Sequence, residues 1–166
     1  MSTAERYHKV YQVSWDQLHR DCRALAWKLI DRPWERIVGI ARGGLIPAAI
    51  MARELEVHLV DTVCLSSYEK SSKGEREQGR LTVLKNLQLT GDLSRTLVVD
   101  DLVDTGSTAS FAREMFPGAT FVTVYAKPAG RKYLDYFVTE VSQDTWILFP
   151  WDAESGYAEP IISRRA

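Results

Sequence analysis

Short, almost wholly apolar runs that alternate with stretches of helical periodicity constrain the fold of this chain most. The expected strands cover residues 36–41, 58–66, 96–99, 120–126 and 136–141, and the expected helices begin at Ser14, Ile46 and Thr108. Strands that are apolar throughout are buried on both faces, and their alternation with helices indicates a parallel sheet covered on both sides. The sequence therefore predicts an α/β fold, with ligands bound beyond the carboxyl ends of the strands.

The first expected helix has a well-marked start. Ser14 is an N-cap residue, and Gln17 three positions later completes the pattern of a capping box. Apolar residues then recur at helical spacing as far as Leu29, and Pro33 is expected to end the segment. The chain contains no repeat and no linker, so residues 1–166 are expected to form a single domain.

The composition excludes several classes of protein. The 166 residues are 45% apolar and 26% charged, and 21 Lys and Arg against 22 Asp and Glu give a net charge of -1. Bulk binding to nucleic acid or to an anionic membrane is therefore not expected. Cys22 and Cys64 form neither a disulfide framework nor, with three scattered His residues, a zinc site. The sequence has no apolar run of about 20 residues and no signal-peptide pattern, so a cytoplasmic protein is expected.

One polar stretch interrupts the alternation. Residues 69–80 contain no apolar residue, and a solvated surface loop is the simplest interpretation. Loops of this length are unusual inside a compact domain and often act as lids. Arg76 and Arg80 are the candidates to reach a phosphorylated ligand from this lid.

The segment from Leu97 to Thr108 carries most of the expected chemistry. A buried strand leads into Asp100 and Asp101, and a turn of small polar residues then opens a helix. Backbone N–H groups and hydroxyls at a helix N-terminus form an anion site, and paired acids can hold sugar hydroxyls and a hydrated Mg²⁺. Helix capping alone would explain one acid in such a turn, but this segment has three, with Asp104.

Three further positions suggest ligand contacts, and each has a structural alternative. Arg42, Gly43 and Gly44 follow a strand, where backbone can approach a phosphate and the arginine can pair with it. The alternative is a strand-to-helix turn with a surface arginine. Lys127 ends a buried strand, where a charge needs a partner, either a ligand or a salt bridge. Trp146 can stack on a purine or fill the core.

Taken together, these segments resemble type I phosphoribosyltransferases, which use phosphoribosyl pyrophosphate (PRPP). The matching segments are residues 41–47 (pyrophosphate loop), 61–68, 97–108 (PRPP motif), 126–130 (purine-contacting lysine) and 144–152 (base-binding end). Residues 61–68 and 144–152 are in addition similar to members of the family that act on 6-oxopurines. The resemblance runs in one order from about Val10 to the C-terminus.

The resemblance implies transfer of ribose 5-phosphate from PRPP to N9 of guanine, xanthine or hypoxanthine, with release of pyrophosphate. It implies a central parallel sheet flanked by helices, with a small hood formed by C-terminal residues, and Mg²⁺ as the cofactor. It also implies a homotetramer or a dimer, with no nucleic acid as partner. A peripheral position at the inner face of the cell membrane is left open by the resemblance.

The same resemblance implies roles for individual residues. The expected catalytic residues are Asp104, as proton acceptor, with Arg42 and Asp100, and Asp101 is the expected metal ligand. The expected PRPP-binding residues are Arg42, Gly43, Asp100, Asp101, Leu102, Val103, Asp104, Thr105, Gly106, Ser107 and Thr108. The expected purine-binding residues are Asp104, Lys127, Trp146, Ile147 and Asp152.

Two backbone expectations follow from comparison with the family pattern. Ser107 replaces the second glycine of the usual Asp-Thr-Gly-Gly-Thr turn, while its neighbours in the turn are kept. Ser107 is therefore expected to hold a helical φ and to turn its hydroxyl toward the 5′-phosphate. In the resembling enzymes the peptide bond at the pyrophosphate loop is often cis, so a cis bond is expected between Ala41 and Arg42.

Three alternative functions share features with this sequence. Phospho-receiver domains also combine paired acids with a strand-end Lys-Pro, but their acid pair lies on the first strand, whereas Asp100 and Asp101 come late in this chain. A regulator that keeps the fold without catalysis should lose the base pocket, yet Lys127 and Trp146 are present. An enzyme for another nucleobase is the third alternative. Titration with PRPP and with individual bases separates these classes.

Overall fold

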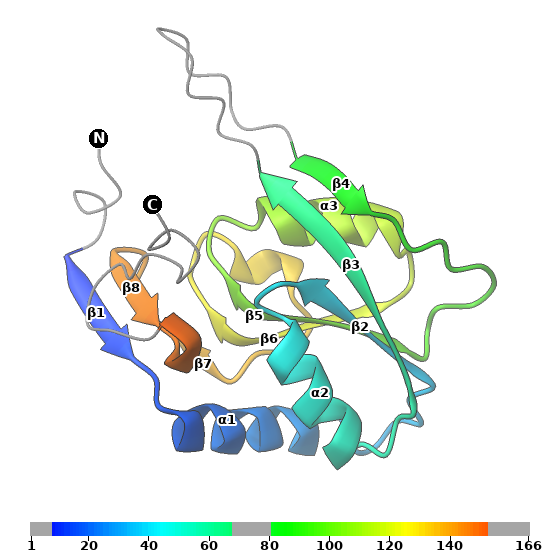
Figure 1. Ribbon diagram of the computed structural model, residues 1–166, viewed down its shortest axis with the longest axis horizontal. Coiled ribbons are helices and arrows are strands. Elements are labelled where there is room, and N and C mark those ends of the chain that lie inside the picture. The colour runs from blue at the N-terminus through cyan, green and yellow to red at the C-terminus, as the bar shows by residue number, and fades with distance from the viewer. Residues whose placement is uncertain (1–7, 68–80, 153–166) are drawn as a thin grey trace, which may run out of the picture.

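A six-stranded sheet in the order β4-β3-β2-β5-β6-β7 forms the centre of the protein (Figure 1). The computed structural model describes residues 8–67 and 81–152, so the expected lid and its Arg76 and Arg80 lie outside the described residues. The strands are β2 (Arg36–Ala41), β3 (Leu59–Ser67), β4 (Leu81–Lys85), β5 (Thr96–Val103), β6 (Thr120–Ala126) and β7 (Thr139–Glu140). All neighbouring strands are parallel except the antiparallel pair β3–β4. The predicted α/β fold is confirmed, and β4 adds an antiparallel edge.

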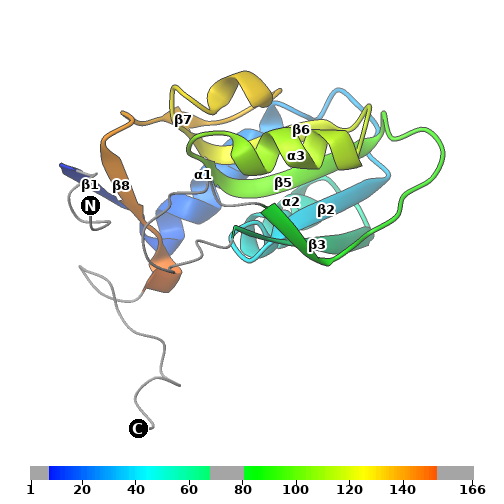
Figure 2. The same cartoon turned by 90° about the horizontal axis from the view of Figure 1, so that it is seen from above.

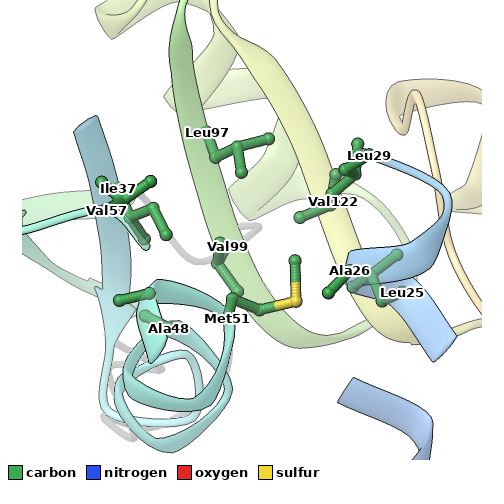
Figure 3. Close-up of a cluster of buried hydrophobic side chains, with 11 residues drawn as sticks. Leu25, Ala26, Leu29, Ile37, Ala48, Met51, Val57, Leu97, Val99 and Val122 are labelled. Atoms are coloured by element: carbon green, nitrogen blue, oxygen red, sulfur yellow. The ribbon is translucent and has the colours of Figure 1, made fainter. Parts of the chain in front are cut away.

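Helices cover both faces of the sheet. Helices α1 (Trp15–Trp27) and α2 (Leu45–Glu54) lie on one face, and α3 (Ser107–Met115) lies on the other (Figure 2). Because successive side chains of a strand point to opposite faces, Leu97 and Val99 of β5 join the cluster with α1 and α2, while Val98 joins the cluster with α3. Figure 3 shows side chains of both helices, including Leu25 and Met51, meeting those of β5.

Helix α1 starts where the sequence predicted, but its first turn differs in detail. The Ser14 hydroxyl accepts a hydrogen bond from the Gln17 backbone N–H at 3.2 Å. The Gln17 side-chain nitrogen donates to the Tyr11 hydroxyl at 2.7 Å. Within this described segment, the Ser14 N–H makes no bond to the Gln17 side chain, so the expected capping box is not completed. The helix also ends at Trp27, six residues before Pro33, because the chain turns there through hydrogen bonds back to the last helical carbonyls.

A small second sheet packs beside the main one. Strand β1 (Lys9–Gln12) pairs in parallel with β8 (Thr145–Leu148), and a 3₁₀ turn, η3 (Pro150–Asp152), follows. We call β1, β8 and η3 the hood. The C-terminal residues predicted to form a hood supply β8 and η3, and β1, from near the N-terminus, adds a strand to it. Ile147 and Phe149 anchor the hood by packing against Tyr125 of β6.

The ends of two strands differ from the sequence prediction. Strand β5 continues through Asp100 and Asp101 to Val103, because its backbone stays paired with β6 up to Ala126. The strand expected at residues 136–141 is only two residues long, and an isolated bridge at Tyr136 precedes it. A 3₁₀ turn, η2 (Arg131–Tyr133), lies between β6 and β7. Among the described residues, no helix is long and apolar enough to cross a membrane.

Candidate active site

Three loops meet at the carboxyl ends of the adjacent parallel strands β2, β5 and β6. A methyl group built on Gly43 would lie 2.3 Å from the Asp101 carboxylate, so the loop after β2 touches β5 directly. A methyl group built on Gly130 would lie 2.8 Å from the Asp104 carbonyl oxygen and 3.1 Å from the Gly106 nitrogen. Real Cβ atoms essentially never come within 3.0 Å of another heavy atom, so a larger residue at Gly43 or Gly130 would force its neighbours to shift.

The turn between β5 and α3 has the form of an anion site. Gly106 supplies a left-handed φ of 92° at the N-cap, and Ser107 is the first helical residue, without a positive φ. The helical φ predicted for Ser107 is therefore confirmed. The Ser107 and Thr105 hydroxyls are 3.1 Å apart, and residues 104–109 line a cavity of about 140 Å³. Backbone N–H groups at the start of α3 and these hydroxyls can bind a phosphate.

The paired acids have different surroundings from ordinary surface carboxylates. The Asp100 side chain accepts a hydrogen bond from the Asp101 N–H at 2.9 Å, and the Asp101 side chain accepts one from the Leu102 N–H at 2.7 Å. Burial, and then the neighbouring Asp101 charge, raises the pKa of Asp100 well above its usual value. Burial raises the pKa of Asp101 to about 6, and the charge of Asp152 in the hood adds to this rise. Burial thus disfavours the charged form of both carboxylates, and a cation beside them would favour it.

The raised pKa of Asp101 predicts a pH dependence of stability. Because its pKa of about 6 exceeds the ordinary 3.8, the folded protein holds an extra proton between these two values, and stability falls as pH rises through this window. Asp101→Asn removes the titrating carboxyl group, and it also removes the charge that raises the pKa of Asp100. In metal-free buffer, the difference in melting temperature, variant minus parent, should increase as the pH is raised from about 4.5 to about 7. A difference that stays constant with pH would contradict this assignment.

A buried lysine and a glutamine amide contact the third acid, Asp104. The Lys127 side chain is 2% exposed, and its Nζ lies 3.2 Å from Oδ2 of Asp104, whose side chain is 30% exposed. The amide nitrogen of Gln143 donates to Oδ1 of Asp104 at 2.6 Å. The salt bridge expected as the alternative for Lys127 is present, and it joins the two residues expected at the base. Sequence reasoning did not single out Gln143, although it directly precedes the matching segment at residues 144–152.

The loop after β2 forms a tight turn. The bond between Ala41 and Arg42 is cis, as predicted. The Gly44 N–H donates to the Ile40 carbonyl at 2.8 Å, and α2 begins at the next residue. Arg42 is exposed, so its guanidinium can meet a ligand at this edge of the sheet.

The remaining residues predicted to bind a ligand include both exposed and buried side chains. Trp146 is 40% exposed between buried neighbours on β8, so it is not a core aromatic. Ile147 is 5% exposed and packs in the core, and Val103 is 4% exposed. These two can offer a ligand only backbone atoms. The Asp152 side chain accepts the Phe149 N–H at 2.9 Å, which holds the end of the hood.

Fold and site together define a class of protein. A strand–turn–helix with paired acids, an N-terminal hydroxyl cluster and two neighbouring strand-end loops is suited to a phosphorylated sugar. The model of the phosphoribosyl transferase domain matches residues 14–158. The chain belongs to the phosphoribosyl transferase family, and the resemblance seen in its motifs is confirmed.

Sequence relatives narrow the class to the xanthine-guanine phosphoribosyltransferases. The chain is 54% identical over 165 residues to the xanthine-guanine phosphoribosyltransferase of Nitratidesulfovibrio vulgaris strain DP4, which covers 99% of this chain and 98% of that one. It is 55% identical over 163 residues to that of Desulfotalea psychrophila, covering 97% and 98%. A solved purine phosphoribosyltransferase from Pyrococcus horikoshii superimposes with a TM-score of 0.73 at 26% identity, covering 92% of this chain and 100% of that one.

Proposed function

We propose that this enzyme transfers ribose 5-phosphate from PRPP to N9 of a 6-oxopurine, with guanine, xanthine and hypoxanthine as acceptors and pyrophosphate as the second product. The relatives named as xanthine-guanine phosphoribosyltransferases support this substrate class. The single observation that carries the proposal is the pair of Asp104 and Lys127 beside the N-terminus of α3. One edge of the sheet thus offers both a base site and a phosphate site.

Each part of the substrate has residues suited to it. The start of α3, from Thr105 to Thr108, binds the 5′-phosphate, and Asp100 binds the ribose hydroxyls. Arg42 and the N–H of Gly43 bind pyrophosphate, whose developing charge they neutralise in an oxocarbenium-like transition state. Holding the two substrates in line supplies much of the remaining rate enhancement.

The base occupies the space between β6 and the hood. Lys127 donates a hydrogen bond to the 6-oxo group, and Trp146 stacks on the purine. Asp104 accepts the proton at the imidazole edge of the base. Ile147 contributes backbone atoms, and Asp152 closes the site near the acids of β5.

Mg²⁺ fits the acids of this site. The described residues contain no group of three or more His, Cys, Asp or Glu that could hold a metal by itself. This suits Mg²⁺, which is commonly bound by one or two carboxylates together with substrate phosphates. Asp101, whose carboxylate lies against Gly43 of the pyrophosphate loop, would hold it. When bound there, Mg²⁺ would supply positive charge that stabilises the leaving pyrophosphate.

Assembly and location complete the proposal. We expect a homotetramer or a dimer, which sedimentation equilibrium of the purified protein measures directly. A cytoplasmic location fits the two free thiols, Cys22 and Cys64, because disulfides are rare in reducing compartments.

Base choice provides the main test of the proposed function. Lys127 has donors and no acceptor, so it suits a 6-oxo group and not a 6-amino group. Steady-state rates with PRPP and Mg²⁺ should show turnover of guanine and xanthine, and almost none of adenine. Equal turnover of adenine and guanine would refute the role of Lys127. Absence of turnover with every base, despite PRPP binding, would favour a regulator that keeps the fold without catalysis.

Substitutions at Ser107 test the phosphate site. A hydrogen bond from a hydroxyl to a charged phosphate contributes about 1.5–3 kcal/mol to binding, and steric crowding by the side chain offsets part of this. Ser107→Gly should therefore weaken PRPP affinity modestly and leave turnover nearly intact. Ser107→Val keeps the bulk without the hydroxyl and should bind PRPP less well than the glycine variant. Equal affinity of all three proteins in a PRPP titration would show that the hydroxyl does not contact the phosphate.

A further inference from the structure

The side-chain amide of Gln143 has both of its ends engaged, although the residue is exposed. Its oxygen accepts a hydrogen bond from the Ala129 backbone N–H at 3.0 Å, and its nitrogen donates to Oδ1 of Asp104 at 2.6 Å. Only an amide oxygen can face a backbone N–H, so the first contact fixes which end points at Asp104.

Gln143 thereby connects three parts of the site. Asp104 follows β5, Ala129 lies in the loop after β6, and Gln143 belongs to the turn that leads into β8. That turn is itself held by short hydrogen bonds, from the Ser142 hydroxyl to Asp144 at 2.5 Å and between the Ser142 and Thr145 hydroxyls at 2.7 Å. The amide is therefore presented from a rigid segment.

The two oxygens of Asp104 receive different donors. Lys127 contacts Oδ2 at 3.2 Å and Gln143 contacts Oδ1 at 2.6 Å. A base that takes a hydrogen bond from Lys127 through its 6-oxo group competes for the first donor. The base leaves the second donor in place, because the contact of the Gln143 oxygen with the Ala129 N–H holds its nitrogen against Asp104.

We propose that Gln143 is a positioning residue that holds the Asp104 carboxylate in the orientation in which it accepts the N7 proton of the purine. This inference rests on the proposed function, and specifically on Asp104 as the acceptor at the imidazole edge. The second torsion of an aspartate side chain is broad, so a donor on one oxygen is needed to fix the plane of the carboxylate. Gln143 thus acts through Asp104 and favours bases that present an N–H at position 7.

Two base analogues separate this role from general support of the loop. 9-Deazaguanine carries an N–H at position 7, whereas 7-deazaguanine carries a C–H there and cannot donate to Asp104. Inhibition constants for both are measured in competition with guanine at saturating PRPP and Mg²⁺. In Gln143→Met, binding of 9-deazaguanine should weaken roughly tenfold, the factor that corresponds to about 1.4 kcal/mol. Binding of 7-deazaguanine and the KM for PRPP should change less than about twofold.

A charged variant distinguishes the two ends of the amide. Gln143→Glu keeps an acceptor for the Ala129 N–H but places a second carboxylate against Asp104. If Gln143 positions Asp104, this variant should weaken the binding of 9-deazaguanine, relative to that of 7-deazaguanine, at least as much as Gln143→Met does. If Gln143 only supports the loop, Gln143→Glu should behave like the parent enzyme, which would overturn the inference. Gln88→Met, an exposed glutamine outside the site, is the matched control and should change neither constant.

Asp104→Asn, tested with the same two analogues, separates failure of the inference from failure of the proposed function. Loss of the preference for 9-deazaguanine in Asp104→Asn, together with its retention in both Gln143 variants, would reject only the role of Gln143. Retention of the preference in Asp104→Asn would reject the role of Asp104 and the inference with it. Equal weakening of both analogues in the Gln143 variants would also overturn the inference.

Discussion

Asp104→Asn is expected to lower kcat/KM for guanine by about 10²–10⁴, the range that a positioned proton acceptor contributes to a rate. Asparagine keeps the shape of the side chain but cannot take a proton. The substitution also removes the negative charge that lies 3.2 Å from Nζ of the buried Lys127. The Gln143 amide nitrogen then faces the uncharged amide of the new side chain instead of a carboxylate. Steady-state kinetics with guanine and PRPP measure the loss, and the KM for PRPP should stay within about twofold of the parent value.

The control for this prediction is an aspartate remote from the site. The Asp92 side chain accepts hydrogen bonds from the backbone and hydroxyl of Ser94, in an exposed turn before β5. Asp92→Asn should leave kcat/KM unchanged. A kcat/KM for Asp104→Asn within about threefold of the parent would be too small a loss for a catalytic acceptor.

Gly44→Ala should have the largest effect on stability. The added methyl group would lie 2.3 Å from the Val99 carbonyl oxygen and 2.8 Å from that of Ile40, and both are backbone atoms of sheet strands. Neither strand can shift without losing hydrogen bonds to its neighbours. Overpacking typically costs about 1–3 kcal/mol, and a clash with two backbone atoms belongs at the upper end of that range. A loss of about 3 kcal/mol lowers the melting temperature by roughly 6–12 °C in a domain of this size, which differential scanning calorimetry can measure.

Gly118→Ala provides a contrast with a different physical cause. Gly118 has a φ of 86° and no atom within 4 Å of the methyl position, so its substitution tests backbone strain alone. That strain costs about 1–2 kcal/mol. Gly44 has an ordinary φ of -75°, so its substitution tests crowding alone. A smaller loss of melting temperature for Gly44→Ala than for Gly118→Ala would mean that the loop after β2 can relax.

Local sequence signals were sufficient where a single segment determines the structure. The apolar runs of β2 and β6 begin and end where the structure has them, because a strand buried on both faces is apolar throughout. The turn at Ser107 was predictable for a similar reason. The conformation of the turn depends on Gly106, which takes the left-handed φ. The residues around Ser107 match the family pattern, which indicated that the shape of the turn is preserved.

Signals failed where a partner distant in sequence determines the structure. Strands β1, β4 and β8 are four or five residues long, and the register of β1 depends on β8, more than 130 residues later. Their patterns are too short to predict a strand without that partner. The two contacts of Gln143 also depend on loops after other strands, so its amide gave no signal in the sequence.

The pairing of β1 with β8 affects the order in which the site can form during synthesis. The phosphate turn and the pyrophosphate loop each consist of one strand and the helix that directly follows it, so both can fold while the chain is still growing. The strand that carries Trp146 must instead pair with a segment made more than 130 residues earlier. The nascent chain can thus form the turns proposed to bind phosphate well before it can form the proposed purine site, which is completed only after β8 has been made.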